Sequence, residues 1–399
     1  MSSTMVKLEK VCDVIRGVTF KPEDLVPPFT ENSIVVMRTK NVQVKGLDYE
    51  DLISIPIDLI KDQKKVLIDG DLLISSANSW YLVGKTSFFE TNKLASPVTA
   101  GGFISIIRPK ASIKSKYLYH WLTTDKSQHK IRHLGRQTTN ISNLDFKQFK
   151  KLEIPLPSLP EQQRIADILD KAEAINQKRE QALALCDEFL RATFLDMFGH
   201  HFSSKGYPSS TKKSIALLTD YIDYRGKTPK KTEYGIPLIT AKNVRKGYVD
   251  EEPREFISED LYDDWMTRGL PLKNDVLFTT EAPLGNVALL GEYEKVAVGQ
   301  RLVSLRCKEE VTPIYFMYAL LDRYTQQLIF QRSSGSTVKG IRTKELYQIE
   351  IPTPPIELQQ KFSSIAEKIN GIKTRIQEAQ ELPLFDALSQ QAFKGELTL

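Results

Sequence analysis

The sequence predicts an α+β (mixed α/β) protein in which two homologous globular domains are joined by two long antiparallel helices that form a coiled coil. Three observations support this prediction. Similar segments occur twice, such as RTKNVQVKG at 38–46 and TAKNVRKG at 240–247. Each copy begins with short β-rich runs broken by Gly, Asn and Pro. Each copy ends in a Pro-rich boundary that is followed by a long stretch of helical periodicity.

The duplication extends along the whole chain. Matching segments keep one order and an offset near 200 residues: DVIRGVTFKP (13–22) with DYIDYRGKTPKK (220–231), IDGDLLISS (68–76) with LKNDVLFTT (272–280), FISIIRP (103–109) with RLVSLRC (301–307), and LEIPLPSLPEQQRI (152–165) with IEIPTPPIELQQKF (349–362). The chain is therefore a tandem repeat, and its two copies are expected to be related by a pseudo-two-fold axis.

The two copies predict globular domains over residues 1–157 and 214–355. Runs such as SIVVM, DLLIS and FISII are rich in aliphatic residues and are bounded by turn-forming residues, which predicts strands. One helix is expected in each domain before the Pro-rich boundary, over 116–133 and over 313–332. The polar segment 200–213 is the expected linker between the two halves.

A first long helix is predicted over 158–199, because no Gly or Pro occurs between Pro160 and Gly199. At ~1.5 Å per residue it would extend roughly 58 Å, too far for its own globule to support, so it is expected to pack on a second helix over 356–399. Pro383 is expected to kink or restart that second helix. The apolar positions expected at the helix seam are Ile165, Ile168, Ala172, Ile175, Phe189, Phe362, Ile365, Ile369, Ile372 and Ile376.

Both helices carry more apolar residues than a two-helix seam needs. A second row runs beside the first seam, and Phe residues gather at the helix ends: Leu169, Leu183, Leu190, Met197, Phe194, Phe198, Phe385 and Phe393. This surplus favours a partner protein on the helices. The alternative is an ordinary helical hairpin without a partner.

Composition excludes several classes of protein. The chain has 399 residues, 41% hydrophobic and 26% charged, which indicates a globular protein without an apolar run long enough to span a membrane. We expect a cytoplasmic location, because the N-terminus lacks the pattern of a signal peptide. The three cysteines are isolated and the five histidines form no ligand pair at helical spacing, so no metal is expected, and His200–His201 is expected in a plain loop.

No catalytic constellation is evident. The two GKT triplets lack the glycine that a Walker A loop needs five residues earlier, where Ser79 and Tyr221 stand. VPPF at 26–29 resembles a methyltransferase loop, but its valine cannot accept a hydrogen bond from a target amino group. Residues 1–155 hold 23 Lys and Arg against 16 Asp and Glu. A repeated, basic, non-enzymatic architecture favours a reader of double-stranded DNA.

The whole chain closely resembles the specificity subunits of type I restriction-modification systems. The resemblance is carried by PLPSLPEQQRIADIL, IPTPPIELQQKF, KNV in both halves and the closing LSQQAFKGEL. It implies two target recognition domains, each reading half of a bipartite asymmetric site, and helices that set the spacing. It also implies methylation subunits, two of them, that bring S-adenosylmethionine, and restriction subunits that bring ATP and Mg²⁺ chemistry. This chain would need no cofactor itself. The alternatives are a self-contained adenine-N6 DNA methyltransferase and a coiled-coil scaffold that binds protein.

Candidate DNA-binding residues follow from a comparison of the two halves. Residues identical in both halves, Lys40 with Lys242 and Asn41 with Asn243, are expected to hold phosphate or to build turns, because they cannot distinguish two half-sites. The segments GRQTTNIS (135–142) and GSTVKGIR (335–342) differ and are the best expected base readers, with a solvated loop as the alternative. The remaining candidates are Asn78, Trp80, Arg136, Gln137, Thr138, Asn140, Arg225, Lys227, Lys230, Lys231, Arg245, Lys246, Ser336, Thr337, Lys339 and Arg342.

Overall fold

The computed structural model describes residues 4–44, 46–137, 141–202, 211–224, 229–379 and 384–397, apart from the side chains of Arg136 and Gln137. The chain divides into two compact units, which we call unit 1 (Met1–Arg179 with Glu378–Leu399) and unit 2 (Glu180–Gln377). Each unit holds one copy of the repeat and a part of each helical region. The structure therefore divides the long helices between the units, whereas the sequence suggested separate helical segments.

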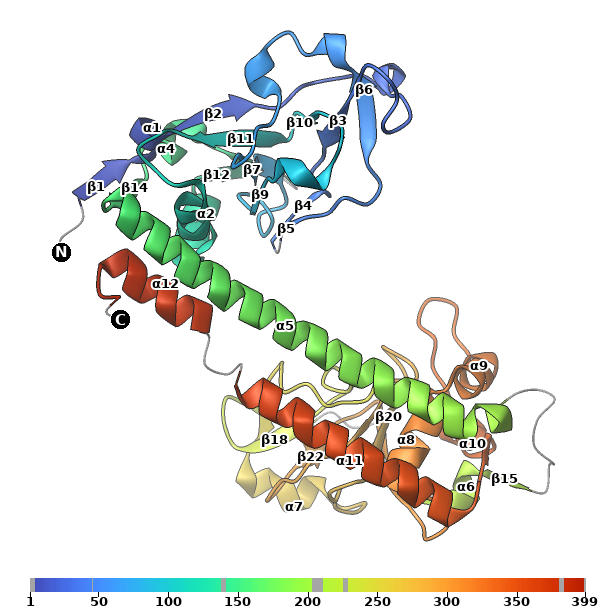
Figure 1. The fold of residues 1–399 in the computed structure, drawn as a ribbon. Coiled ribbons are helices and arrows are strands. Elements are labelled where there is room, and N and C mark those ends of the chain that lie inside the picture. The colour runs from blue at the N-terminus through green and yellow to red at the C-terminus, as the bar shows by residue number, and fades with distance from the viewer. Residues whose placement is uncertain are drawn as a thin grey trace. The chain divides into compact units, whose positions relative to one another are not determined.

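A four-stranded antiparallel sheet forms the centre of unit 1, in the order β2-β11-β7-β9. Its strands are β2 (Cys12–Arg16), β11 (Ile104–Pro109), β7 (Leu72–Ser75) and β9 (Thr86–Phe88). Side chains alternate across a strand, so Leu72 and Ile74 join one apolar core while Leu73 joins another. The sheet thus separates a core that faces the helices from a core that faces the rest of the domain (Figure 1).

Smaller sheets complete unit 1. In one of them β3 (Ser33–Met37) runs parallel to β10 (Val98–Ala100) and antiparallel to β6 (Ile53–Pro56). The other strands are β1 (Thr4–Lys7), paired with β14 (Glu153–Leu156), the pair β4 (Val42–Gln43) and β5 (Gly46–Leu47), and the set β12 (Gly135–Gln137), β13 (Ser142–Leu144) and β8 (Ala77–Asn78). Two single-turn helices, α1 (Leu8–Val11) and α4 (Phe146–Phe149), connect strands.

Unit 2 repeats this plan. Its central antiparallel sheet has the order β16-β23-β20-β21, with β16 (Thr219–Asp223), β23 (Leu302–Cys307), β20 (Val276–Thr279) and β21 (Val287–Leu289). A second sheet contains β17 (Lys231–Thr232), β19 (Phe256–Ile257), β18 (Ile236–Ile239) and β22 (Ala297–Val298). The remaining elements are the pair β15 (Lys212–Ser214) and β24 (Glu350–Pro352) and the short helices α6 (Ile215–Leu218), α7 (Tyr262–Trp265) and α10 (Thr343–Tyr347).

The repeat is also visible in buried polar contacts. Arg108 forms a two-pronged hydrogen bond with buried Asp71 in unit 1, and Arg306 does the same with buried Asp275 in unit 2. The hydroxyl groups of Tyr117 and Tyr315 each donate to a proline carbonyl, of Pro155 and Pro352, at 2.8 Å. The two copies therefore share their internal polar framework as well as their strand order.

The single helix expected before each Pro-rich boundary is two helices in both units. In unit 1 α2 (Ser115–Thr123) and α3 (Asp125–His133) are separated by Thr124, whose side chain accepts from the N–H of Ser127. In unit 2 α8 (Pro313–Leu321) and α9 (Arg323–Gln331) are separated by Asp322, which accepts from the N–H of Tyr324. Both separating residues have extended backbone and good capping side chains, so they end one helix and begin the next.

The first long helix, α5 (Leu159–Phe198), is continuous over 40 residues. Ile165 and Ala172 are buried as expected, but Ile175 and Phe189 are 41% and 51% exposed, so the predicted seam is wrong at these two positions. In the surplus row, Leu169 and Leu190 are fully buried, and Leu183 and Met197 are half-buried. Residues of α5 such as Leu169 and Phe198 belong to the apolar cores of the globular domains, so a heptad seam alone does not account for the buried face of this helix.

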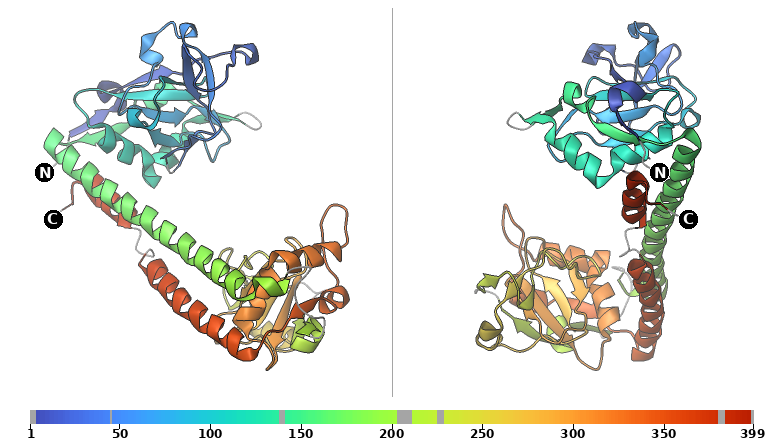
Figure 2. Two further views of the ribbon diagram at one scale, coloured as in Figure 1. Left: turned by 45° about the vertical axis from the view of Figure 1, so that its right-hand side comes forward. Right: turned by 90° about the vertical axis from the view of Figure 1, so that its left-hand side faces the viewer.

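The second helical region is two helices, α11 (Ile356–Glu378) in unit 2 and α12 (Leu384–Lys394) in unit 1. Pro383 lies outside the described residues. In unit 2 α11 runs antiparallel to the end of α5, since Phe362 contacts Phe198 and Lys373 pairs with Asp187 (Figure 2). Phe362 is buried and Ile365, Ile369 and Ile376 are half-buried, but Ile372 is 46% exposed, which contradicts its predicted place in the seam.

The Phe residues at the helix ends are covered by the globular domains. Phe194 and Phe198 are buried in the core of unit 2, beside Tyr315. Phe393 packs against Tyr117 and Phe385 against His120 in unit 1. The surplus of apolar residues is thus largely satisfied within the chain, which removes that argument for a partner protein.

Two further segments bear on the sequence analysis. His200 and His201 lie in a short 3-10 helix, Gly199–Phe202, and burial lowers the pKa of His201 to about 4. Most of the expected linker, 203–210, lies outside the described residues. Within the described part of the chain, no helix has the length and apolar character needed to cross a membrane.

Candidate nucleic-acid interface

In unit 1 the chain leaves the central sheet after β7 and enters a separate three-stranded sheet, which contains part of the first expected base-reading segment. β7 is followed directly by β8, and β8 pairs with β13, so that Asn78 lies opposite Ser142 and Ala77 opposite Asn143. β13 in turn pairs with β12, which contains the backbone of Arg136 and Gln137. Thr138 and Asn140 lie outside the described residues. The structure thus places Asn78 opposite Ser142, at the end of the expected base-reading segment, although the two residues are far apart in the sequence.

An aromatic cluster lies beside this segment in unit 1. Trp80 packs edge-on against His133, with ring centroids 5.7 Å apart, and the guanidinium carbon of Arg132 lies 6.0 Å from the Trp80 ring. The neighbouring Tyr81 is 76% exposed and was not a candidate from the sequence, although its position in SWYLVG could have signalled it. Exposed aromatic rings and arginine next to polar loops are common features of nucleic-acid interfaces.

In unit 2 the equivalent segment borders an open cleft of about 400 Å³. Backbone hydrogen bonds in both directions between Ser334 and Gly340 close the intervening loop, and Gly335 has a φ of 106°, which favours glycine. Ser336, Thr337 and Lys339 are exposed in this loop, and Arg342 lines the cleft. The cleft also contains Glu281 and Arg301, an ion pair with 2.9 Å between Nε and Oε1.

The two repeated asparagines hold turns. Asn41 is fully buried; its Oδ1 accepts from the N–H of Arg38, and its Nδ2 donates to the carbonyls of Asp48 and Glu50. Asn243 makes the same pattern with Thr240, Asp250 and Pro253. Both amide groups are used by backbone partners, so neither can bind phosphate unless its turn opens.

Several of the candidate basic residues carry acidic partners. Lys40 pairs with Asp51, and Arg245 pairs with Asp250 at 3.2 Å. Lys231 and Lys242 both pair with Glu255, at 2.8 and 3.2 Å. Burial alone would raise the pKa of Glu255, but hydrogen bonds and charge from these two lysines hold that pKa below its ordinary value.

Two further lysines of unit 2, Lys230 and Lys246, are exposed. Arg225 and Lys227 lie outside the described residues. A phosphate group that binds Lys231 or Lys242 would have to compete with Glu255. The side chains of Lys230 and Lys246 are exposed to solvent.

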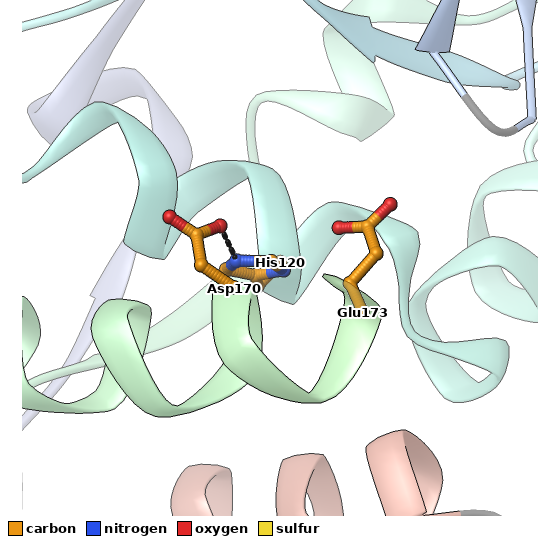
Figure 3. A group of neighbouring side chains, drawn as sticks. All are labelled: His120, Asp170 and Glu173. Atoms are coloured by element: carbon orange, nitrogen blue, oxygen red, sulfur yellow. Dashed lines mark hydrogen bonds and ion pairs between the residues drawn. The ribbon is translucent and has the colours of Figure 1, made fainter. Parts of the chain in front are cut away.

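One polar group among the described residues has the composition of a metal site. The ligand atoms of His120, Asp170 and Glu173 lie within 4.8 Å of one another, and the ring of His120 lies between the two carboxylates (Figure 3). However, Nε2 of His120 lies 2.7 Å from Asp170 Oδ1, and Nζ of Lys116 is 3.6 Å from the same oxygen. The lysine charge already neutralises Asp170 and would repel a cation. The group is best explained as a polar contact that holds α5 against α2.

Comparisons with known proteins agree with this architecture. The family model described as type I restriction modification DNA specificity domain matches residues 2–185 and 218–382. The EcoKI specificity subunit of Escherichia coli K12 is 24% identical, over 97% of this chain and 88% of that protein. The putative MjaX specificity subunit of Methanocaldococcus jannaschii is 25% identical, over 93% of this chain and 87% of that protein.

A solved structure shows the same fold. The type I restriction-modification system S subunit from M. genitalium superposes with a TM-score of 0.57 at 16% sequence identity, covering 99% of this chain and 96% of that one. The tandem repeat, the family model that matches both halves, and the relatives that match over most of their length lead to the same conclusion. The chain belongs to the type I restriction-modification DNA specificity family and is a specificity subunit of such a system.

Proposed function

We propose that unit 1 and unit 2 each read one half of a bipartite, asymmetric DNA site, and that the helical regions set the distance between the halves. One observation carries this proposal: the two units share the same backbone framework and buried polar contacts, yet present different side chains beside β8 in unit 1 and around the cleft in unit 2. A shared frame with different exposed side chains is what two different half-sites require.

In this proposal the chain selects the site and does no chemistry. It acts in the cytoplasm with two methylation subunits, which bring S-adenosylmethionine, and with restriction subunits, which use ATP and Mg²⁺. The methylation subunits dock on the helical regions, where Ile175, Phe189 and Ile372 are exposed. A heptad seam between the two helices would have buried these three side chains. Because they are exposed instead, their apolar surface is available to a partner protein.

Methylation mapping tests this function. Host DNA is sequenced for methylated adenine with and without this gene, with the methylation subunit present in both. We expect a split motif that depends on this chain. Methyl transfer by the purified chain alone would instead support the self-contained methyltransferase, and DNA binding without salt dependence or base preference would support the protein-binding scaffold.

Arg136→Ala gives a sharper test within unit 1. The segment that contains Arg136 differs between the halves, so the substitution should weaken recognition of one half-site only, by ~1 to 3 kcal/mol at one base pair. Binding is measured on duplexes altered in either half-site. An equal loss on every duplex would show that Arg136 contacts phosphate.

A further inference from the structure

Phe103 in unit 1 and Arg301 in unit 2 occupy equivalent backbone positions, but one side chain is aromatic and the other is basic. In unit 1 the N–H of Ser76 donates to the carbonyl of Phe103 at 2.9 Å; in unit 2 the N–H of Thr280 donates to the carbonyl of Arg301 at 2.9 Å. Phe103 immediately precedes strand β11, and Arg301 immediately precedes the equivalent strand β23. We call this place the edge position.

The residues around the edge position are equivalent as well. The N–H of Leu144 donates to the carbonyl of Ser76, and the N–H of Ile341 donates to that of Thr280, both at 2.9 Å. The edge position therefore belongs to one rigid framework that joins the central sheet to the expected base-reading segment in each unit. Differences at the edge position come from the side chains and not from a different fold.

The pairs of residues next to the edge position differ between the units, and in each pair a larger residue lies opposite a smaller one. In unit 1 small Ala77 lies opposite Asn143. In unit 2 the larger Glu281 lies opposite Gly340, where an added Cβ would come within 3.3 Å of the Glu281 side chain. Glycine at 340 thus leaves room for Glu281, and Glu281 holds the Arg301 guanidinium through Nε.

The two residues at the edge position, Phe103 and Arg301, are exposed to solvent. Phe103 is 65% exposed, and the Arg301 side chain is 50% exposed at the cleft. Arg301 has a φ of 71°. Residues other than glycine rarely adopt this backbone conformation, and those that do often lie at functional sites. The ion pair places Nε of Arg301 2.9 Å from Oε1 of Glu281. A guanidinium group carries five N–H donors, four of them on its two terminal nitrogens, so it can keep this contact and also donate to a base.

We propose that the edge position is a specificity determinant: Arg301 donates two hydrogen bonds to O6 and N7 of a guanine in one half-site, and Phe103 contacts a thymine methyl group in the other. Glu281 is a positioning residue that fixes the plane of the guanidinium. The inference rests on the proposed half-site function. Its chemistry is that of direct readout in the major groove.

The test uses the full chain assembled with its methylation subunits and duplexes in which each base pair of the mapped site is replaced in turn. Arg301→Ala should lose about 5- to 100-fold of discrimination at one G·C pair in one half-site and keep its preferences elsewhere. Phe103→Ala should relax one A·T pair in the other half-site. Arg301→Lys keeps the charge but not the fork, so it should keep overall affinity and lose the guanine preference.

Controls separate folding from recognition. Arg301→Gly removes the side chain and suits the positive φ, so thermal stability should not fall while the guanine preference is lost. Glu281→Ala should weaken the preference and Glu281→Gln should restore part of it. Arg254→Ala is the matched control, because Arg254 is an exposed arginine of unit 2 that is paired with Glu251 and Glu252.

Two outcomes would overturn the inference: an Arg301→Ala complex that keeps its guanine preference, or one that loses affinity equally on all duplexes. A wild-type complex that shows no base preference in either half-site would instead overturn the proposed function itself.

Discussion

Asn41 and Asn243 illustrate how a repeated residue serves the fold. Each amide connects a tight turn to carbonyls seven to ten residues further along the chain. The sequence showed that the two residues are equivalent but left turn building and phosphate binding open. The contacts with Asp250 and Pro253 decide in favour of the turn, and these partners are visible only once the loop is folded.

Asn243→Ala should therefore destabilise unit 2 locally. Removing the buried amide breaks its part-buried hydrogen bonds to the carbonyls of Asp250 and Pro253, which costs ~1 to 3 kcal/mol. Hydrogen exchange of unit 2 peptides should show faster opening, whereas Lys242→Ala, an exposed neighbour, should change stability by less than about 0.5 kcal/mol. If Asn243→Ala kept its exchange rates and lost DNA affinity, the amide would be a phosphate ligand after all.

The ion pair between Glu281 and Arg301 could not be predicted from the sequence. They stand at the ends of different strands, so no local motif connects them. The aligned segments FISIIRP and RLVSLRC did place Phe103 and Arg301 at equivalent positions. The missing information was that both residues are exposed, since an arginine or phenylalanine at a strand edge is equally compatible with packing.

The length of helix α5 could be predicted from the sequence, but the face of the helix that is buried could not. Its lack of Gly and Pro between Pro160 and Gly199 predicts one long helix, and the structure confirms it as Leu159–Phe198. Two apolar rows lie side by side on this helix, and helical periodicity alone cannot say which one faces a neighbour. Leu169 and Leu190 of one row are buried, whereas Ile175 and Phe189 of the other row are exposed.

Two adjacent residues of α5 separate packing from partner binding. Leu190 is fully buried, so Leu190→Ala should lower the free energy of unfolding of unit 2 by ~2 to 5 kcal/mol. Phe189 is 51% exposed, so Phe189→Ala should cost less than about 0.5 kcal/mol but weaken association with the methylation subunit. Denaturant titration and co-purification measure the two effects. Undiminished association of Phe189→Ala would place the docking surface elsewhere.

The contact between α5 and α2 should make unit 1 sensitive to acid. Burial would raise the pKa of Asp170, but the hydrogen bond from His120 and the charge of Lys116 outweigh it and lower that pKa. A carboxyl with a depressed pKa in the folded state adds stability above its unfolded-state pKa, near ~3.9, and this stability is lost as pH falls through the folded pKa.

Asp170→Asn should therefore reduce the stability of unit 1 at neutral pH, and the difference from the wild type should shrink in strong acid. Thermal unfolding followed between neutral pH and pH ~2 measures this. Asp167→Asn is the matched control, because Asp167 is exposed on the same helix. A stability difference independent of pH would show that the contact acts through shape rather than charge.

For the whole molecule, the tandem repeat was the strongest signal in the sequence, because equivalent segments recur in one order along the chain. The division into units was not predictable, since the chain passes from one unit to the other inside helical regions, at Arg179–Glu180 and at Gln377–Glu378. Neither position carries a Gly, Pro or polar linker that would signal a boundary. The boundary at Arg179–Glu180 lies inside the continuous helix α5, whereas residues 380–383 between α11 and α12 lie outside the described residues. Because a helix has a fixed rise per residue, the length of α5 would set the spacing under the proposed function.

Seven residues of helix-forming sequence inserted after Arg179, with seven more after Glu378, should therefore lengthen the unread spacer of the DNA site. The insertion adds ~10.5 Å of helix, equivalent to at most about three base pairs at ~3.4 Å each, and changes the helical phase by only ~20°. Adenine methylation mapping of the variant reads the spacer directly, and both half-site sequences should be unchanged. The same seven residues added after Leu397 are the control and should leave the spacer as it was. A variant that methylates the original site with its original spacer would show that the helices do not measure the distance between the half-sites.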